Sequence, residues 1–204
     1  MIYQGVNGLC ALDIRNVNLN ISSPEKISLL EEQGFTIIPV DLEIMARQQI
    51  GAPYRRGALI REAPHTFDCS SLIKWLYGHK GIWLPRNLLL WLELGQDIPV
   101  QNLEYGDIVF TSGPINYPVK NISGGIGHVG MVTNRQTVIH TTNRTGVIEI
   151  PLDLFIRKKT FRTARRIFSN ETITLAIPKE KEVETSDDIA WILYQALEAK
   201  LRVR

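Results

Sequence analysis

The stretch TFDCSSLIKWLY, residues 66–77, starts a helix around which the rest of this chain is organised. Asp68 is a good N-cap, because its carboxylate can accept hydrogen bonds from the unpaired amides of the first turn. Apolar side chains at 72, 73, 76 and 77 recur at helical spacing and define an inward face. Cys69 lies on that face, where the helix dipole and free N–H groups favour a thiolate. The stretch predicts a nucleophile at Cys69; the simpler alternative is a small buried apolar residue.

The composition limits the partners of the chain. Its 204 residues suffice for one sizeable core, and 44% hydrophobic with 22% charged residues is typical of a globular protein. A net charge of +2 is too small to indicate binding to nucleic acid or to an anionic membrane. No apolar run is long enough to cross a bilayer. We therefore expect no nucleic-acid partner and no membrane span.

The sequence has no motif for a metal or an organic cofactor. Two cysteines, Cys10 and Cys69, could form one disulfide in an oxidising compartment, but they make no larger framework. No cysteines are closely spaced and no helical His-Glu-x-x-His is present, so we predict no metal and no cofactor. Residues 1–10 have neither a basic region nor an apolar core. We therefore expect no signal peptide and a cytoplasmic location as synthesised.

The hydrophobic pattern divides the chain into three parts. Residues 1–41 are expected to form an accessory prologue, in which strands at 12–21 and 35–40 flank a helix. The main domain is expected at 42–178. Residues 179–204 are expected to form a charged linker followed by an amphipathic helix.

The main domain changes from helical to alternating periodicity along its length, which predicts an α+β fold. We expect helices at 42–49, from Cys69, and at 84–94. Strands are then expected at 108–110, 128–133, 137–142, 146–150 and 160–168. Glycine, proline, asparagine and serine are frequent in 111–127, which is typical of a long surface loop.

Two histidines are expected to meet on one face of the predicted sheet. If 134–136 is a three-residue hairpin loop, His128 lies opposite Thr142, and His140 is the diagonal neighbour of His128. A two-residue loop would place the rings on opposite faces. We predict Cys69 as nucleophile, His128 as base and His140 as the residue that orients the imidazole. The alternatives are structural histidines, or a zinc ion bound by the three side chains, for which the spacing gives no support.

Several motifs resemble the NlpC-type (NlpC/P60) papain-like cysteine peptidases. They are FDCSSL at 67–72, GDIVF at 106–110, GHVGM at 127–131 and VIH at 138–140, in that family's order. APYRRG at 52–57, LPR at 84–86 and GV at 146–147 also resemble family elements. The resemblance covers about residues 42–168. Permuted relatives that are lipid acyltransferases place histidine before cysteine, so the order here disfavours them.

The resemblance implies a papain-like fold, with the catalytic cysteine on a helix packed against an antiparallel sheet that carries the histidines. It implies an endopeptidase that cuts peptidoglycan stem peptides, commonly at the D-γ-glutamyl–diamino acid bond. By resemblance Tyr54 would act near the oxyanion, while Asp68 and Ser70 would frame the nucleophile and contact the substrate.

The chain departs from the family pattern at two residues expected to contact the substrate. Arg56 stands where tryptophan is usual, and Trp91 where glutamine often follows the Leu-Pro-Arg motif. These changes, with the long 111–127 loop, leave two other functions open. One is the same thiol chemistry on a non-wall peptide or amide, as in an effector or phage protein. The other is a catalytically idle binding module.

Overall fold

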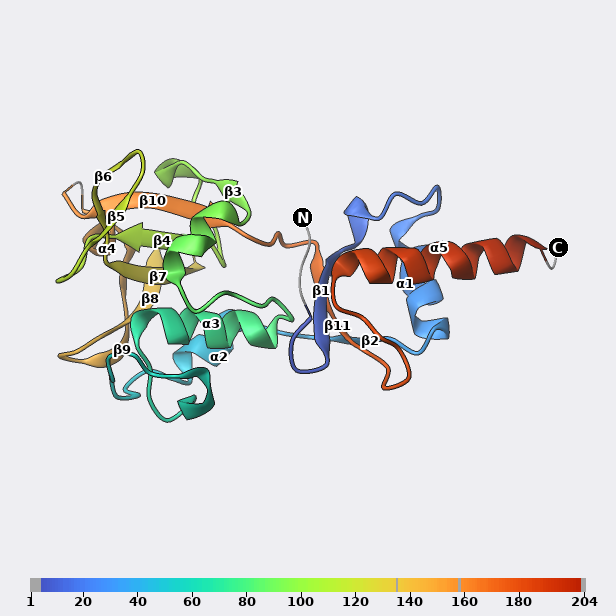
Figure 1. Cartoon of the computed structure of the whole chain (residues 1–204), viewed down its shortest axis with the longest axis horizontal. Coiled ribbons are helices and arrows are strands. Elements are labelled where there is room, and N and C mark those ends of the chain that lie inside the picture. The colour runs from blue at the N-terminus through green and yellow to red at the C-terminus, as the bar shows by residue number, and fades with distance from the viewer. Residues whose placement is uncertain (1–4, 135, 158, 203–204) are drawn as a thin grey trace. The chain divides into compact units, whose positions relative to one another are not determined.

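The computed structural model describes residues 5–134, 136–157 and 159–202, and it divides into two compact units (Figure 1). One unit contains Met1–Val40, Tyr77–Trp83 and Ser169–Arg204. The other contains Asp41–Leu76 and Leu84–Phe168. We call them the small unit and the large unit, and describe each by itself.

The small unit is built on a three-stranded antiparallel sheet in the order β1-β11-β2. The strands are β1 (Leu9–Asp13), β11 (Thr172–Ala176) and β2 (Thr36–Ile38), and the helices are α1 (Ser23–Glu32) and α5 (Ser186–Arg202). Their apolar faces share one core with fully buried members from both ends of the chain: Cys10, Leu30, Leu175, Ile189 and Leu193. The three-part division expected from the sequence therefore differs from the observed one. Strand β11 lies within the expected 42–178 domain, yet it joins the prologue and the C-terminal helix into one unit.

Local signals explain part of the small unit. Ser22 and Glu25 form the capping box that starts α1, with Pro24 in its first turn. The strand expected at 12–21 is wrong, because the strand is β1 and a 3-10 turn (Ile14–Asn16) follows it. Buried and exposed side chains continue to alternate as far as Ile21. The N–H of Ile21 donates to Leu19 O, however, and residues 17–21 are not paired with a strand.

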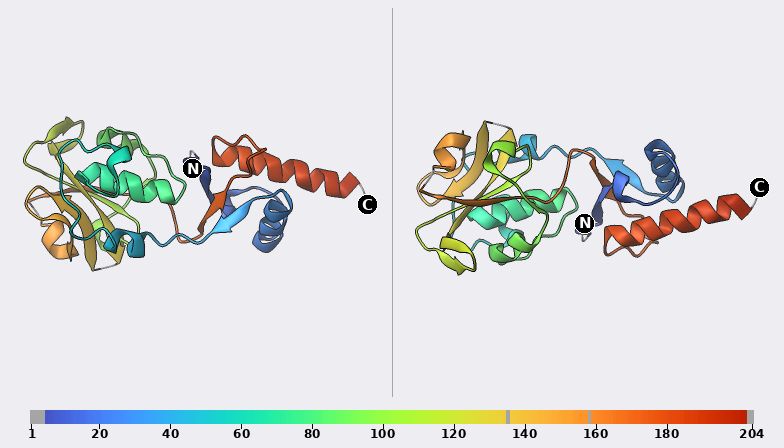
Figure 2. Two further views of the ribbon diagram at one scale, coloured as in Figure 1. Left: turned by 90° about the horizontal axis from the view of Figure 1, so that it is seen from below. Right: turned by 90° about the horizontal axis from the view of Figure 1, so that it is seen from above.

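The large unit is a six-stranded antiparallel sheet in the order β3-β10-β4-β7-β8-β9 with helices around it, which confirms the expected fold class (Figure 2). The strands are β3 (Gln96–Asp97), β10 (Phe161–Arg166), β4 (Ile108–Thr111), β7 (His128–Asn134), β8 (Thr137–Thr142) and β9 (Gly146–Pro151). The helices are α2 (Leu42–Arg47), α4 (Leu152–Phe155) and most of α3 (Cys69–His79), whose last residues, 77–79, belong to the small unit. Short 3-10 helices cover Ile60–Glu62, Leu88–Glu93 and Val100–Asn102.

Two expected segments of this unit differ in detail. The segment 111–127 is not an irregular loop throughout, because β5 (Tyr117–Val119) and β6 (Ile122–Ile126) pair as a two-stranded hairpin. The helix expected at 84–94 is only the 3-10 helix Leu88–Glu93, which Asn87 caps.

The register of β7 and β8 decides whether the two histidines meet. Met131 lies opposite Ile139 and Val132 opposite Val138, which is the register that a three-residue loop predicts. Next to the turn a bulge shifts the pairing, so that Asn134 faces Thr137. Arg135, in the expected loop, lies outside the described residues.

Candidate active site

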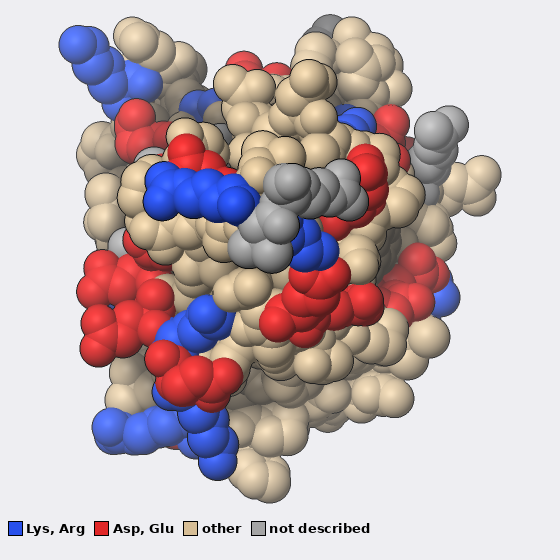
Figure 3. Space-filling view, turned by 90° about the vertical axis from the view of Figure 1, so that its right-hand side faces the viewer, with Lys and Arg blue, Asp and Glu red and all other residues tan. Residues whose placement is uncertain are grey.

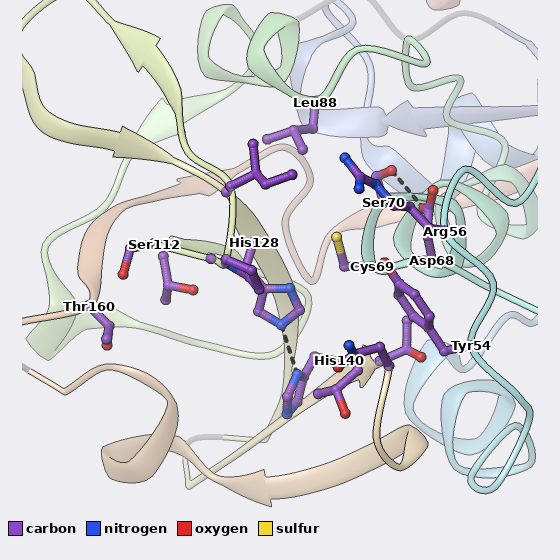
Figure 4. A pocket seen from close by; sticks show the side chains of 18 of the residues that line it. Tyr54, Arg56, Asp68, Cys69, Ser70, Leu88, Ser112, His128, His140 and Thr160 are labelled. Atoms are coloured by element: carbon purple, nitrogen blue, oxygen red, sulfur yellow. Dashed lines mark hydrogen bonds between the residues drawn. The ribbon is translucent and has the colours of Figure 1, made fainter.

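A pocket of about 770 Å³ in the large unit collects seven of the eight predicted site residues (Figure 4). They are Tyr54, Arg56, Asp68, Cys69, Ser70, His128 and His140. The loop before α3, the first turn of α3, and strands β7 and β8 supply them. Segments far apart in the chain thus present one set of polar side chains to the same cavity.

The first turn of α3 fixes the position of Cys69. Asp68 Oδ1 accepts from the Ser71 N–H at 2.7 Å, and Ser71 Oγ accepts from the Asp68 N–H at 2.8 Å. Each of the two side chains therefore accepts a hydrogen bond from the backbone N–H of the other residue. Asp68 is thus the N-cap that the sequence predicts. Cys69 is left at the first helical position, with its side chain partly exposed to the pocket.

Asp68 and Ser70 are held by an arginine that our predicted site omits. Arg86 donates from Nη2 to Asp68 Oδ2 and from Nη1 to Ser70 Oγ, both at 2.8 Å. Ser70 Oγ in turn donates to Asp68 Oδ1 at 2.8 Å. Asp68 and Ser70 therefore brace the start of α3. The signal for Arg86 was its place in the Leu-Pro-Arg motif.

Burial governs the thiol of Cys69. It raises the pKa of Cys69 to about 11, and the Asp68 carboxylate adds to the rise. Backbone N–H groups of Val129, Ser70 and Cys69 lower the pKa by a smaller amount. The prediction that the helix start favours a thiolate is therefore wrong for the resting site, because desolvation and the Asp68 charge outweigh the backbone N–H groups.

The two histidines form a hydrogen-bonded pair. His128 Nε2 lies 2.9 Å from His140 Nδ1, and the ring planes are inclined at 79°. Nδ1 of His128 is thereby left for the thiol side of the pocket, and Figure 4 shows Cys69 on that side. Burial lowers the pKa of His128 to about 4 and that of His140, with a contribution from His128, to about 3. At neutral pH the site rests as a neutral thiol beside neutral imidazoles.

The required tautomer can be assigned from this hydrogen bond. For His128 Nδ1 to accept a proton, its Nε2 must carry the ring hydrogen and donate it to His140 Nδ1. His140 Nε2 then carries a hydrogen; this atom is buried and has no partner within the described residues. The ring of Phe155 packs against both imidazoles.

The remaining predicted residues separate into two groups. Tyr54 lines the pocket, and its pKa is raised first by burial and then by the nearby Cys69 and Asp68. Trp91, in contrast, is fully buried and donates from Nε1 to Pro85 O at 2.9 Å. The prediction that Trp91 contacts substrate is therefore wrong; it anchors the segment that carries Arg86.

Sequence reasoning missed the far wall of the pocket. Ile115 and Tyr117 come from the hairpin segment, and Leu154, Phe155 and Arg157 from α4 and its end. No motif marked these residues. Only the unusual length of 111–127 suggested that this side of the site would differ.

The structure bears on the disulfide and zinc alternatives. Cys10 and Cys69 are not joined in a disulfide. Over the described ranges, no group of three or more His, Cys, Asp or Glu side chains is placed to hold a metal ion. The hydrogen bond between His128 and His140 also occupies one nitrogen of each ring.

Among the described residues, no helix has the length and apolar character needed to cross a membrane.

The surface shown in Figure 3 carries both signs of charge. Lysine and arginine side chains lie among aspartates and glutamates on this face, with uncharged surface between them. Basic and acidic side chains are therefore interspersed on this face.

Comparisons with known proteins point to one family. The NlpC/P60 family model matches residues 51–166. A probable endopeptidase of Corynebacterium glutamicum is 36% identical over 99 residues, which are 48% of this chain and 40% of that protein. The murein DD-endopeptidase MepS/murein LD-carboxypeptidase of Escherichia coli K12 is 27% identical over 121 residues, 58% of this chain and 57% of that protein. The chain thus spans about half the length of these curated relatives.

A comparison with a solved structure supports the fold. An NlpC/P60 family protein from Bacillus cereus superposes with a TM-score of 0.55 at 24% identity. The superposition covers 66% of this chain and 42% of that one. At this identity the likeness concerns the fold alone.

Proposed function

The chain belongs to the NlpC/P60 family, and we propose that it is a cysteine endopeptidase that hydrolyses amide bonds in peptidoglycan stem peptides. The curated relatives described above are named a probable endopeptidase and a murein DD-endopeptidase/LD-carboxypeptidase. The bond that we assign is the D-γ-glutamyl–diamino acid bond, which the resemblance of its motifs implies. The observation that carries the proposal is the hydrogen bond between His128 and His140 in the pocket that also holds Cys69.

The first half of the proposed reaction forms an acyl-enzyme. The Cys69 sulfur attacks the carbonyl carbon of the scissile amide while its proton passes to Nδ1 of His128. The Cys69 backbone N–H and the Tyr54 hydroxyl stabilise the tetrahedral oxyanion. The His128 imidazolium then gives its proton to the amine nitrogen as the C–N bond breaks, which leaves a thioester on Cys69.

The second half releases the product. A water molecule attacks the thioester carbonyl, and His128 takes its proton. As the C–S bond breaks, the His128 imidazolium returns the proton to the Cys69 sulfur, and the carboxylic acid product leaves and loses its proton to solvent. His140 accepts the hydrogen bond from His128 Nε2 throughout, and so keeps the imidazole in the useful tautomer. This scheme uses no metal and no cofactor.

Digestion of purified muropeptides tests the proposal. Mass spectrometry should detect fragments produced by cleavage of a stem-peptide amide bond with the wild type, and none with Cys69→Ala. Cys10→Ala is the matched control, because Cys10 is fully buried and lies in the small unit. Absence of new fragments with the wild type would remove the peptidoglycan assignment. Fragments that persist with Cys69→Ala would remove the cysteine mechanism.

A further inference from the structure

The pocket holds more positive charge than its own side chains neutralise. Three arginines line it, Arg56, Arg86 and Arg157, whereas Asp68 is the one carboxylate among its lining residues. Asp68 is already paired with Arg86, with 2.8 Å between Oδ2 and Nη2. No carboxylate of the lining is therefore left for the other two guanidinium groups.

Two adjacent arginines in the loop before α3 have different roles. Arg55 donates to Glu62 Oε2, which also accepts from the Leu59 N–H, so Arg55 closes the loop. Arg56 is exposed, and across the described part of the chain its side chain makes no ion pair and no hydrogen bond. Its guanidinium is therefore free to meet a ligand.

Arg56 lies on the thiol side of the site. The rise in the pKa of Tyr54, which comes from burial, Cys69 and Asp68, is opposed by the charge of Arg56. The guanidinium is therefore close enough to the phenol to act on it electrostatically. Figure 4 places Arg56, Tyr54 and Cys69 together, whereas Thr160 and Ser112 lie beyond His128.

We propose that Arg56 binds a free carboxylate of the substrate beside the scissile amide, and so selects a γ-linked glutamyl residue whose α-carboxyl group is not amidated. This inference rests on the proposed function and names a specificity determinant for it. A guanidinium offers a planar fork of N–H donors that matches the two oxygens of a carboxylate. A carboxamide has one acceptor oxygen, and its NH₂ group would face those donors. The site should therefore discriminate between the two groups although they have nearly the same shape.

A binding experiment on the inactive variant tests the inference without relying on turnover. The ligands are L-alanyl-γ-D-glutamyl-L-lysine and its D-isoglutamine counterpart, which differ by one carboxylate. Calorimetry would compare Cys69→Ala with Cys69→Ala/Arg56→Gln. The matched control is Cys69→Ala/Arg61→Gln, because Arg61 is exposed in the same loop and does not line the pocket. Circular dichroism checks that each variant is folded.

We expect Cys69→Ala to bind the carboxylate ligand about tenfold more tightly than the carboxamide, as for one charge-assisted contact. The ratio should fall to about one with Arg56→Gln and stay unchanged with Arg61→Gln. Absence of binding, absence of a preference, or a preference that survives Arg56→Gln would overturn the inference. So would a preference lost with Arg157→Gln instead.

Parallel digestion of both ligands by the protein with Cys69 intact separates the two proposals. Binding that depends on Arg56, without cleavage of either ligand, would contradict the proposed cleavage and leave the carboxylate site standing. Cleavage that depends on Cys69, with equal kcat/KM for both ligands and for Arg56→Gln, would leave the peptidase standing and remove the carboxylate site.

Discussion

The ring of Phe155 packs nearly edge-on against the imidazole of His140, with 4.9 Å between ring centroids and 64° between ring planes. The same ring lies 5.7 Å from that of His128. Phe155 is buried at the end of α4, so an apolar surface from outside the β7–β8 hairpin covers both imidazoles. It limits the rotation of the rings and their contact with water.

Phe155→Leu should lower kcat/KM about tenfold with little change in KM, because a positioning contact is lost and substrate contacts remain. The readout specific to this role is the pH profile. Hydration of the rings should raise the pKa of His128 toward its ordinary value, so the acid limb of the kcat/KM profile should move to higher pH. Phe161→Leu is the matched control, since Phe161 packs in the same apolar cluster. An unshifted acid limb in Phe155→Leu would show that Phe155 only contributes to stability.

The parts of the site that the sequence predicts are those set by local rules. Asp68 and Ser71, three residues apart, exchange hydrogen bonds between side chain and backbone N–H. The start of α3 and the position of Cys69 therefore follow from the local sequence. The meeting of His128 and His140 follows from strand parity and one loop length.

The parts that the sequence does not predict depend on distant partners. Trp91 is buried because its indole donates to Pro85 O, which no periodicity reveals. The alternation after β1 gives no strand, because β11, from the other end of the chain, pairs with β1 at Leu9–Asp13. The direction of the pKa shift of Cys69 depends on the balance between desolvation and backbone N–H groups, and tertiary packing sets that balance.

Gly130 should tolerate no larger side chain. A Cβ at this position would lie 2.6 Å from Val138 Cγ1 and 2.8 Å from Phe155 Cζ. Gly130→Ala should therefore destabilise the chain by about 1–3 kcal/mol through overpacking, and should displace Phe155 from the histidines. Urea unfolding measures the stability, and kcat/KM the site. Gly78→Ala is the control, because Gly78 lies within α3 and a Cβ there meets nothing within 4 Å. Equal stabilities of the two variants would contradict the predicted crowding.

Stability should fall as the pH drops from about 6.5 to 4. The pKa of His128 is lowered to about 4 in the folded chain, so between pH 4 and its unfolded value, about 6.5, the unfolded chain binds more protons. The contribution of His128 is complete above pH 6.5 and is lost as the pH falls toward 4. Its size is about 3 kcal/mol, at about 1.4 kcal/mol for each pKa unit.

Urea unfolding of the wild type and His128→Gln at pH 7, 5.5 and 4 measures this contribution as a difference, so that effects of the carboxylates cancel. His65→Gln is the control, since His65 is exposed. A difference in unfolding free energy that stays constant over this pH range would contradict the burial of a neutral His128.

Alkylation of Cys69 should be slow at neutral pH. Its rate should continue to rise at pH values above those at which an ordinary thiol is fully ionised. Burial raises the pKa of Cys69 to about 11, whereas a free cysteine titrates near 8.5. With iodoacetamide, the rate in a Cys10→Ala background should therefore rise about tenfold for each pH unit from 7 to 9.5, because the thiolate fraction does so below the pKa. The alkylation rate of a small-molecule thiol, measured in parallel, should reach a plateau above the pKa of that thiol. A plateau below pH 8.5 would contradict the neutral resting pair and would indicate a thiolate already paired with the His128 imidazolium. In that case His128→Gln should abolish the plateau, because the cation that holds the thiolate would be gone.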